Sequence, residues 1–163
     1  MIEPKPHPSI ADTTLSMKVK KNIALIAHDH RKRDLLDWAN YNREHLAEHN
    51  LFGTGTTGSL AEKKLALPVR KFKSGPLGGD LQIGNAIIEN KIDIMIFFWD
   101  PLLAQPHDVD VKALLRICVV YNIPLACNRS SADFLISSPL METKYERFIV
   151  DYSQRFNKEI DAE

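Results

Sequence analysis

The chain has 163 residues, enough for one domain and few for two. Lysine plus arginine and aspartate plus glutamate each number 21, so the formal charge is zero and no overall charge signature of nucleic-acid binding is present. The apolar fraction of 44% is that of an ordinary globular domain. No apolar run reaches the roughly 20 residues of a membrane span, so we expect no membrane partner. The balanced charge likewise leads us to expect no nucleic-acid partner.

Residues 1–20 lack the apolar core of a signal peptide, and three prolines interrupt them. We expect a loose N-terminal extension there, a single domain over 21–163, and a cytoplasmic location. The two cysteines, Cys118 and Cys127, lie in the apolar stretch RICVVYNIPLACN, which favours buried reduced thiols. No Cys/His pair with ligand spacing accompanies them, so neither a disulfide nor a metal pair is expected.

The first half of the chain alternates between strand and helix patterns. The apolar run NIALIA (22–27) predicts a buried strand, and the apolar positions of 31–48 lie on one helical face. The segment LFGTGTTG (51–58) predicts a very short strand that breaks into a Gly/Thr loop. A helix of about two turns should follow through Leu65, and residues 69–73 predict another short strand.

The second half continues this alternation. Residues 80–90 predict a helix, and IDIMIFFW (92–99) predicts a strand whose nearly unbroken apolar character indicates burial on both faces. Asp108 is a suitable N-cap for the next helix. The segment IPLACN (123–128) predicts a fifth strand, and SSAD (130–133) opens another helix.

The tail, 145–163, is polar with sparse apolar positions, and we expect a helix there.

Strand–helix alternation within one domain implies an α/β fold with three layers, a mainly parallel five-stranded sheet and helices on both faces. Ligands of such sheets bind beyond the carboxyl ends of the strands. The polar and glycine-rich motifs all follow predicted strands: His28-Asp29, TGTTG, SGPLGGD, Asp100 with His107, and Asn128.

The segment TGTTG (54–58) has the composition of an anion-binding loop. Its threonines offer hydroxyl groups, and a following helix would present its N-terminus. The segment lacks the Gly-Lys-[Ser/Thr] of a P-loop and the spacing of a dinucleotide fold, so a small phosphate fits better than a nucleotide. Lys32 could add a positive charge. A plain glycine-rich turn and a solvated lysine remain open as alternatives.

Four side chains are candidates for acid–base chemistry. A carboxylate such as Asp80 can remove a carbon-bound proton only if the resulting oxyanion is stabilised nearby, a task that suits His107. Asp100 and Asp110 could belong to the same site. Each also has a structural interpretation, because Asp100 precedes a proline and Asp110 lies in the first turn of a predicted helix.

The sequence leaves two alternative functions open. The sequence His-Asp-His at 28–30, together with His107, could bind zinc or iron in a hydrolase. The Gly/Thr segments add anion sites that such a centre does not require, so we expect no metal. A non-catalytic, effector-binding regulatory domain of the same fold would not need both Asp80 and His107.

The motifs together resemble one family. Its pattern is matched in order, from residue 22 to 139, by IALIAHDHRK, GTGTTG, SGPLGGDLQIG, KIDIMIFFWDPLLAQPHDVDVKALLR and YNIPLACNRSSADFLISSP. This set is similar to that of bacterial methylglyoxal synthases. The resemblance implies a single-domain Rossmann-like α/β fold, usually a homohexamer, that converts dihydroxyacetone phosphate to methylglyoxal and inorganic phosphate. It also implies inhibition by phosphate and no metal or organic cofactor.

The resemblance also implies roles for individual residues. Asp80 falls on the position of the catalytic base, and His107 on that of the histidine that polarises the substrate carbonyl. Asp100 and Asp110 match further active-site carboxylates. The substrate- and phosphate-binding positions are His28, Lys32, Thr54, Gly55, Thr56, Thr57, Ser74 and Gly75. The tail aligns loosely, so a phosphate contact from Arg155 or Lys158 stays undecided.

Overall fold

The computed structural model describes residues 13–102 and 108–152. Its centre is a five-stranded parallel sheet in the order β4-β3-β2-β5-β6. The strands are β2 (Asn22–Ala27), β3 (Asn50–Gly53), β4 (Val69–Lys71), β5 (Ile94–Phe98) and β6 (Leu125–Ala126). The expected α/β fold with a parallel five-stranded sheet is thus confirmed.

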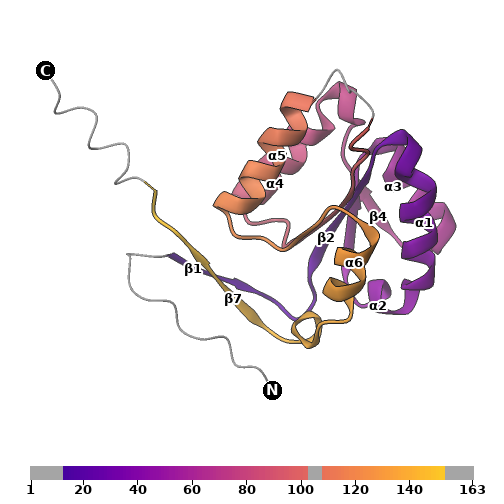
Figure 1. Cartoon of the computed structure of the whole chain (residues 1–163). Coiled ribbons are helices and arrows are strands. Elements are labelled where there is room, and N and C mark those ends of the chain that lie inside the picture. The colour runs from indigo at the N-terminus through magenta and orange to yellow at the C-terminus, as the bar shows by residue number, and fades with distance from the viewer. Residues whose placement is uncertain (1–12, 103–107, 153–163) are drawn as a thin grey trace, which may run out of the picture.

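Helices cover both faces of the sheet, giving three layers (Figure 1). One face carries α1 (Lys32–Tyr41), α2 (Arg43–Ala47), α3 (Gly55–Leu65) and α6 (Arg129–Ile136), and the other carries α4 (Gly79–Ile88) and α5 (Asp108–Val120). Short 3-10 turns are η1 (Asp29–Arg31), η2 (Gly75–Leu77) and η3 (Pro139–Glu142).

The core is divided by the sheet into two apolar clusters. Successive residues of β2 alternate between them, with Leu25 facing α1 and α3 and Ile26 facing α4 and α5. This alternation explains why the central strands read as continuous apolar runs. Trp38 of α1 is fully buried, and its indole N–H donates to Asp133 of α6 at 2.9 Å, which ties two helices of one layer together.

The segment TGTTG differs from the prediction of a loop followed by a helix. Helix α3 begins at Gly55, so these residues form its first turn. A Cβ on Gly53 would lie 2.8 Å from the Cα of Gly58, and one on Gly55 would lie 3.0 Å from the backbone N of Ser74. The glycines therefore let the strand, the start of the helix and the next loop pack closely. Turn propensity alone does not predict this packing.

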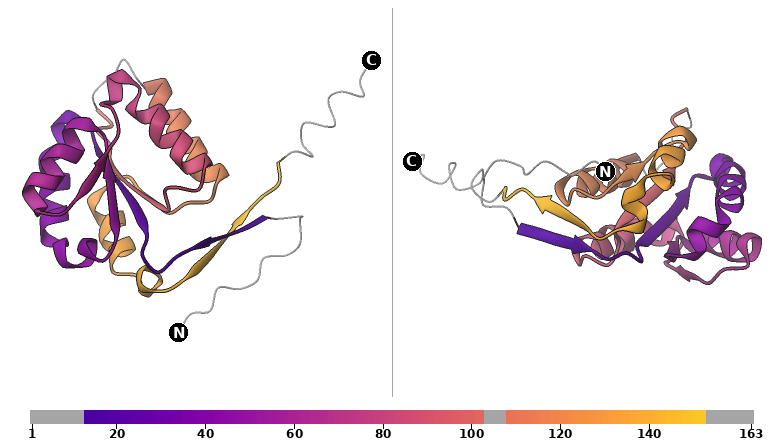
Figure 2. Two further views of the ribbon diagram at one scale, coloured as in Figure 1. Left: turned by 180° about the vertical axis from the view of Figure 1, so that it is seen from behind. Right: turned by 90° about the horizontal axis from the view of Figure 1, so that it is seen from below.

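The chain forms a second, two-stranded antiparallel sheet, here called the ribbon. It pairs β1 (Thr13–Met17) with β7 (Tyr145–Ile149) and projects from the body of the molecule (Figures 1 and 2). The prediction of a helix within 145–163 is wrong for Tyr145–Ile149, which form a strand, because pairing with a strand near the other end of the chain overrides local propensity. Residues 13–17 of the expected extension are likewise a strand, and residues 1–12 and 153–163 lie outside the described residues.

Buried polar groups attach the ribbon to the body. Arg147 is 1% exposed and donates to the carbonyl of Tyr121 at 2.8 Å and to the side chain of Asn90. Asp93 accepts the N–H of Asn22 at 2.8 Å. Burial lowers the pKa of Arg147 and raises that of Asp93, while the opposite charge of each group opposes the shift of the other.

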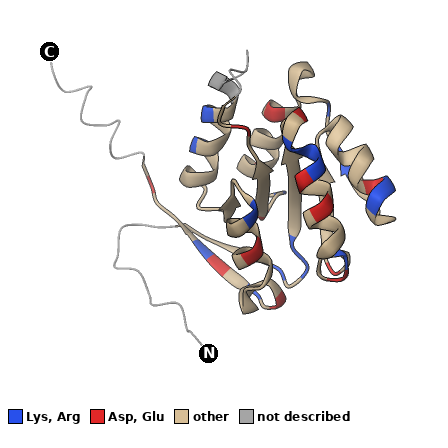
Figure 3. Ribbon diagram, turned by 45° about the vertical axis from the view of Figure 1, so that its right-hand side comes forward, with Lys and Arg blue, Asp and Glu red and all other residues tan. Residues whose placement is uncertain are grey.

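None of the helices in 13–102 and 108–152 is long and apolar enough to cross a bilayer. Figure 3 shows lysine and arginine interspersed with aspartate and glutamate over the helices. The mixture agrees with a formal charge of zero.

Candidate active site

The strand order reverses between β2 and β5, since the chain adds β3 and β4 on one side of β2 and then β5 and β6 on the other. A crevice is expected at the carboxyl ends of the two strands at such a switch point. His28 follows β2 and Asp100 lies two residues beyond β5. The backbone N–H of Asp100 donates to Nδ1 of His28 at 3.1 Å and joins the two loops.

A pocket of about 270 Å³ lies at this switch point. The connections that follow β2, β3 and β4 line it, and residues of β2, β5 and the helices α1, α3, α4 and α5 complete its wall. The lining residues are Ile26, Ala27, His28, Asp29, Lys32, Thr54, Thr56, Thr57, Ser74, Gly75, Pro76, Asp80, Phe97, Val111 and Leu114. The volume is just below the roughly 300–1,000 Å³ of pockets for drug-sized ligands, which indicates a small ligand.

The N-terminus of α3 forms one end of the pocket. The N–H groups in the first turn of a helix lack carbonyl partners within that helix, and the helix dipole is positive there, so this end favours an anion. Thr57 lies in the turn and is 1% exposed. Its Oγ1 is buried and has no hydrogen-bond partner among the described residues. A bound oxyanion would supply the missing acceptor.

The segment SGPLGGD folds tightly beside this anion end. Gly78 has φ of 89°, in the left-handed region, and a Cβ on Gly79 would lie 2.0 Å from the carbonyl oxygen of Lys73. The backbone at Gly78 thus favours glycine and Gly79 has no room for a side chain, which fixes the turn into α4. Asp80 then lies in the first turn of α4, where the helix dipole favours a carboxylate. A Cβ on Gly75 would lie 3.3 Å from Asp80 Oδ2.

A cation lines the same pocket. Lys32 Nζ lies 2.5 Å from Asp29 Oδ1, and the lysine side chain is 20% exposed whereas the aspartate is 86% exposed. The hydrogen bond from Lys32 and its charge hold the pKa of Asp29 below its usual range. Because Asp29 is largely in solvent, water screens this pair and its stabilising effect is small. The lysine can therefore turn towards an anionic ligand at little cost.

The remaining wall of the pocket is apolar. Phe97 is 2% exposed, and Val111 and Leu114 of α5 lie beside it in the second core cluster. The Phe97 ring meets the His28 ring edge to face, with ring centroids 5.2 Å apart and an interplanar angle of 89°. An apolar wall excludes water and strengthens the electrostatic interactions of the polar groups opposite it.

The structure brings most of the predicted residues into one pocket. Those that line it are His28, Lys32, Thr54, Thr56, Thr57, Ser74, Gly75 and Asp80. Gly55 does not line it, although both its chain neighbours do. The Asp100 carboxylate instead accepts the N–H of Leu102 at 3.1 Å, within its own loop. His107 and the side chain of Asp110 lie outside the described part of the structure.

Two of the pocket residues that were not predicted to bind substrate, Asp29 and Phe97, contact residues that were. Asp29 was predicted only as a candidate metal ligand, although its spacing of three residues from Lys32 also indicates an ion pair. Phe97 was assigned to a buried strand without a role, and nothing in its local sequence distinguishes it from Phe98. Within residues 13–102 and 108–152, no three His, Cys, Asp or Glu side chains are grouped to hold a metal ion.

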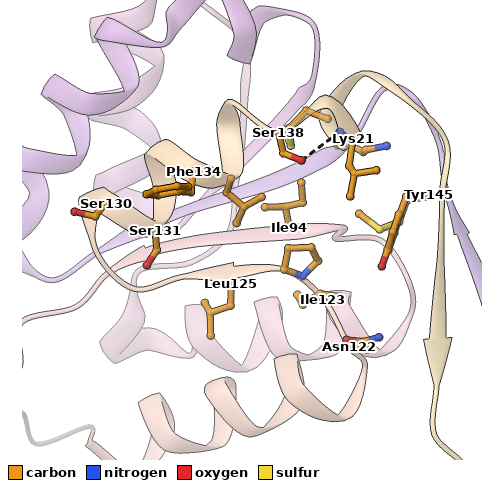
Figure 4. A pocket seen from close by; sticks show the side chains of 15 residues that line it. Lys21, Ile94, Asn122, Ile123, Leu125, Ser130, Ser131, Phe134, Ser138 and Tyr145 are labelled. Carbon is orange, nitrogen blue, oxygen red and sulfur yellow. Dashed lines mark hydrogen bonds between the residues drawn. The ribbon is translucent and has the colours of Figure 1, made fainter. Parts of the chain in front are cut away.

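A larger cavity of about 740 Å³ lies elsewhere, at the base of the ribbon (Figure 4). Its walls come mainly from η3, α6, β6 and the residues before β6, with Ile94, Leu125, Phe134 and Tyr145 among the apolar side chains. Among the described residues, Lys21 is its one charged lining residue, and the Lys21 ammonium group donates to the carbonyls of Lys18 and Thr143. No carboxylate or histidine of the described residues lines this cavity, whereas Asp80 and His28 line the smaller one, which therefore has side chains suited to acid–base chemistry.

Comparison with known proteins places the chain in a family. The family described as MGS-like domain matches residues 34–127, more than half of the chain. A methylglyoxal synthase of Leptospira interrogans is 56% identical, with 89% of this chain and 98% of the relative covered. This chain belongs to the methylglyoxal synthase family. It is therefore an enzyme, a carbon–oxygen lyase, and the resemblance of its motifs to that family is confirmed.

Further methylglyoxal synthases agree in sequence and in fold. The protein of that name from Clostridium acetobutylicum is 57% identical, over 88% of this chain and 99% of its own length. The crystal structure of methylglyoxal synthase from Elizabethkingia anophelis NUHP1 superposes with a TM-score of 0.83 at 51% identity, covering 88% of this chain and 95% of that one. The likeness therefore extends over nearly the whole methylglyoxal synthase chain.

Proposed function

We propose that this protein converts dihydroxyacetone phosphate to methylglyoxal and inorganic phosphate, in the cytoplasm and without a metal or organic cofactor. One observation carries the proposal. A carboxylate, Asp80, lines the same small pocket as a helix N-terminus whose buried Thr57 hydroxyl lacks an acceptor among the described residues. A candidate base and a helix end that favours an anion thus line one small pocket.

The phosphate group of the substrate is held by the first turn of α3, by Ser74 and Gly75, and by the ammonium group of Lys32. Asp80 removes a proton from the hydroxymethyl carbon, and the electron pair forms an enediolate. His107, by family resemblance, donates a hydrogen bond to the developing oxyanion. The enediolate then expels phosphate by breaking the C–O bond, and the enol product takes up a proton on carbon to give methylglyoxal.

The orientation of the phosphate decides the outcome. Elimination requires the C–O bond to phosphate to stand perpendicular to the enediolate plane, so that its antibonding orbital overlaps the π system. An isomerase acting on the same substrate must keep that bond in the plane. We therefore assign TGTTG and Ser74-Gly75 an orienting role as well as a binding role, since both segments meet the pocket from rigid helix starts.

The deciding experiment is an assay with dihydroxyacetone phosphate that detects methylglyoxal and inorganic phosphate separately. Equal amounts of both products support the proposal, and glyceraldehyde 3-phosphate in their place would contradict it. The substitution Asp80→Asn should abolish turnover while phosphate binding, measured by calorimetry, stays nearly unchanged. If that variant kept more than about a tenth of the rate, a loss of only ~1.4 kcal/mol, Asp80 would not be the base.

The family resemblance extends the proposal to assembly and regulation. We infer a homo-oligomer, a hexamer in the family pattern, that inorganic phosphate inhibits. Light scattering coupled to gel filtration measures the first property. Initial rates at increasing phosphate concentration measure the second, and their shape distinguishes simple competition from cooperative inhibition.

A further inference from the structure

We propose that His28 meets the substrate as a neutral imidazole with its proton on Nε2, and that Phe97 is the positioning residue that holds the ring in place. The inference rests on the proposed function only for the identity of the ligand. The tautomer and the packing of the ring are properties of the free protein. The groups that set them are the ring of Phe97 and two backbone groups, the carbonyl of Phe98 and the N–H of Asp100, at the carboxyl end of β5.

The hydrogen bond to Nδ1 decides the tautomer. The donor is the backbone N–H of Asp100, at 3.1 Å, and a peptide N–H cannot accept a hydrogen bond. Nδ1 must therefore present its lone pair. Neutral imidazole then carries its proton on Nε2, whereas imidazolium would place two N–H groups against each other. His28 is thus prepared to donate from Nε2 to an oxygen of the substrate.

Contacts with β5 fix the orientation of the ring. The backbone N–H of His28 donates to the carbonyl of Phe98 at 3.2 Å, which continues the parallel pairing of β2 with β5. The ring itself stands edge to face against Phe97 at 5.2 Å and 89°. Phe97 is buried and lines the pocket with His28, so its ring limits rotation of the imidazole about χ1 and χ2.

The strand supplies a matched control. Phe97 and Phe98 are neighbours on β5, both at most 2% exposed, and their side chains point to opposite faces of the sheet. Phe98 packs near Trp38, with ring centroids 6.1 Å apart, in the cluster away from the pocket. The substitutions Phe97→Leu and Phe98→Leu remove the same atoms from equally buried positions. Only the first removes a contact with His28.

The first test is spectroscopic and uses the full-length free protein with ¹⁵N-labelled histidine. We expect His28, assigned by its loss in His28→Gln, to show a protonated Nε2 and an unprotonated Nδ1 at neutral pH. The opposite tautomer or an imidazolium would overturn the inference. Because no substrate is present, this result is independent of whether dihydroxyacetone phosphate is converted.

The second test compares variants kinetically. A glutamine amide can place an N–H near the position of Nε2, so His28→Gln should stay within about tenfold of wild-type kcat/KM, whereas the shorter His28→Asn should lose about 100-fold. Equal losses would overturn the role of a neutral donor. Phe97→Leu should lose about tenfold or more through misplacement of the ring, with Phe98→Leu unchanged. Equal activity of the two leucine variants, or an unaltered His28 spectrum in Phe97→Leu, would overturn the positioning role.

Discussion

Replacing Thr57 by valine should make the protein more stable and its phosphate site weaker at the same time. Valine has nearly the shape of threonine, so packing in the first turn of α3 is kept. The hydroxyl that is removed is buried and has no partner among the described residues. The free protein therefore loses a desolvated polar group and no hydrogen bond.

The two effects have comparable sizes and opposite consequences. An unsatisfied buried polar group costs about 1–3 kcal/mol, so removing it should raise the free energy of unfolding by up to that amount. A hydrogen bond to a charged acceptor contributes about 1.5–3 kcal/mol, so phosphate affinity should fall roughly 10- to 150-fold. The β-branched side chain of valine leaves helix propensity nearly unchanged.

Urea unfolding without ligand gives the stability, and calorimetric titration with inorganic phosphate gives the affinity. Thr57→Ser is the matched control, because it keeps the hydroxyl and removes the buried methyl group. We expect serine to retain phosphate binding and to lose about 1 kcal/mol of stability, the reverse of valine. A destabilised valine variant would mean that the hydroxyl has a partner in the free protein. A valine variant that binds phosphate normally would remove Thr57 from the site.

The other predictions concern groups away from the pocket. Burial, together with the charge of Lys21, lowers the pKa of His49, and its Nδ1 accepts the Lys21 N–H at 3.3 Å, so the folded protein holds this histidine neutral. The resulting stability is complete above the ordinary pKa of 6.5 and is lost as the pH falls. Between about pH 7 and pH 5, the unfolding free energy of His49→Asn should therefore fall less than that of wild type. Parallel curves of unfolding free energy against pH would contradict this. Burial and nearby Cys127 raise the pKa of Cys118 to about 12, so iodoacetamide should alkylate native protein at the half-buried Cys127 and reach Cys118 only after denaturation, as mass spectrometry can show.

The parallel sheet could be predicted because its strands carry their own signal. The run 92–99 is apolar on both sides, and burial on both faces is what the structure shows for β5. The position of the smaller pocket, the candidate site, could also be predicted, since the rule that ligands bind at the carboxyl ends of strands depends only on strand order. His28, Ser74 and Asp80 accordingly line one pocket.

Features set by contacts between distant residues could not be predicted. The ribbon depends on pairing Thr13 with Ile149, and neither segment has a strong strand pattern by itself. The first turn of α3 starts at Gly55 because that glycine packs against Ser74, a contact that no local propensity describes. The Asp100 carboxylate binds an amide of its own loop, a structural alternative that its position before a proline had left open.

The ribbon also has a consequence for the order in which the molecule assembles. Its two strands lie at opposite ends of the described chain, with all five strands of the parallel sheet between them. Closing so long a loop costs more chain entropy than any pairing within the sheet, and two strands alone are barely stable. The ribbon should therefore form last, on a folded body in which Tyr121 and Asn90 can accept hydrogen bonds from Arg147. During unfolding, the ribbon can also separate from the body first, while the pocket at the carboxyl ends of β2 and β5 stays folded.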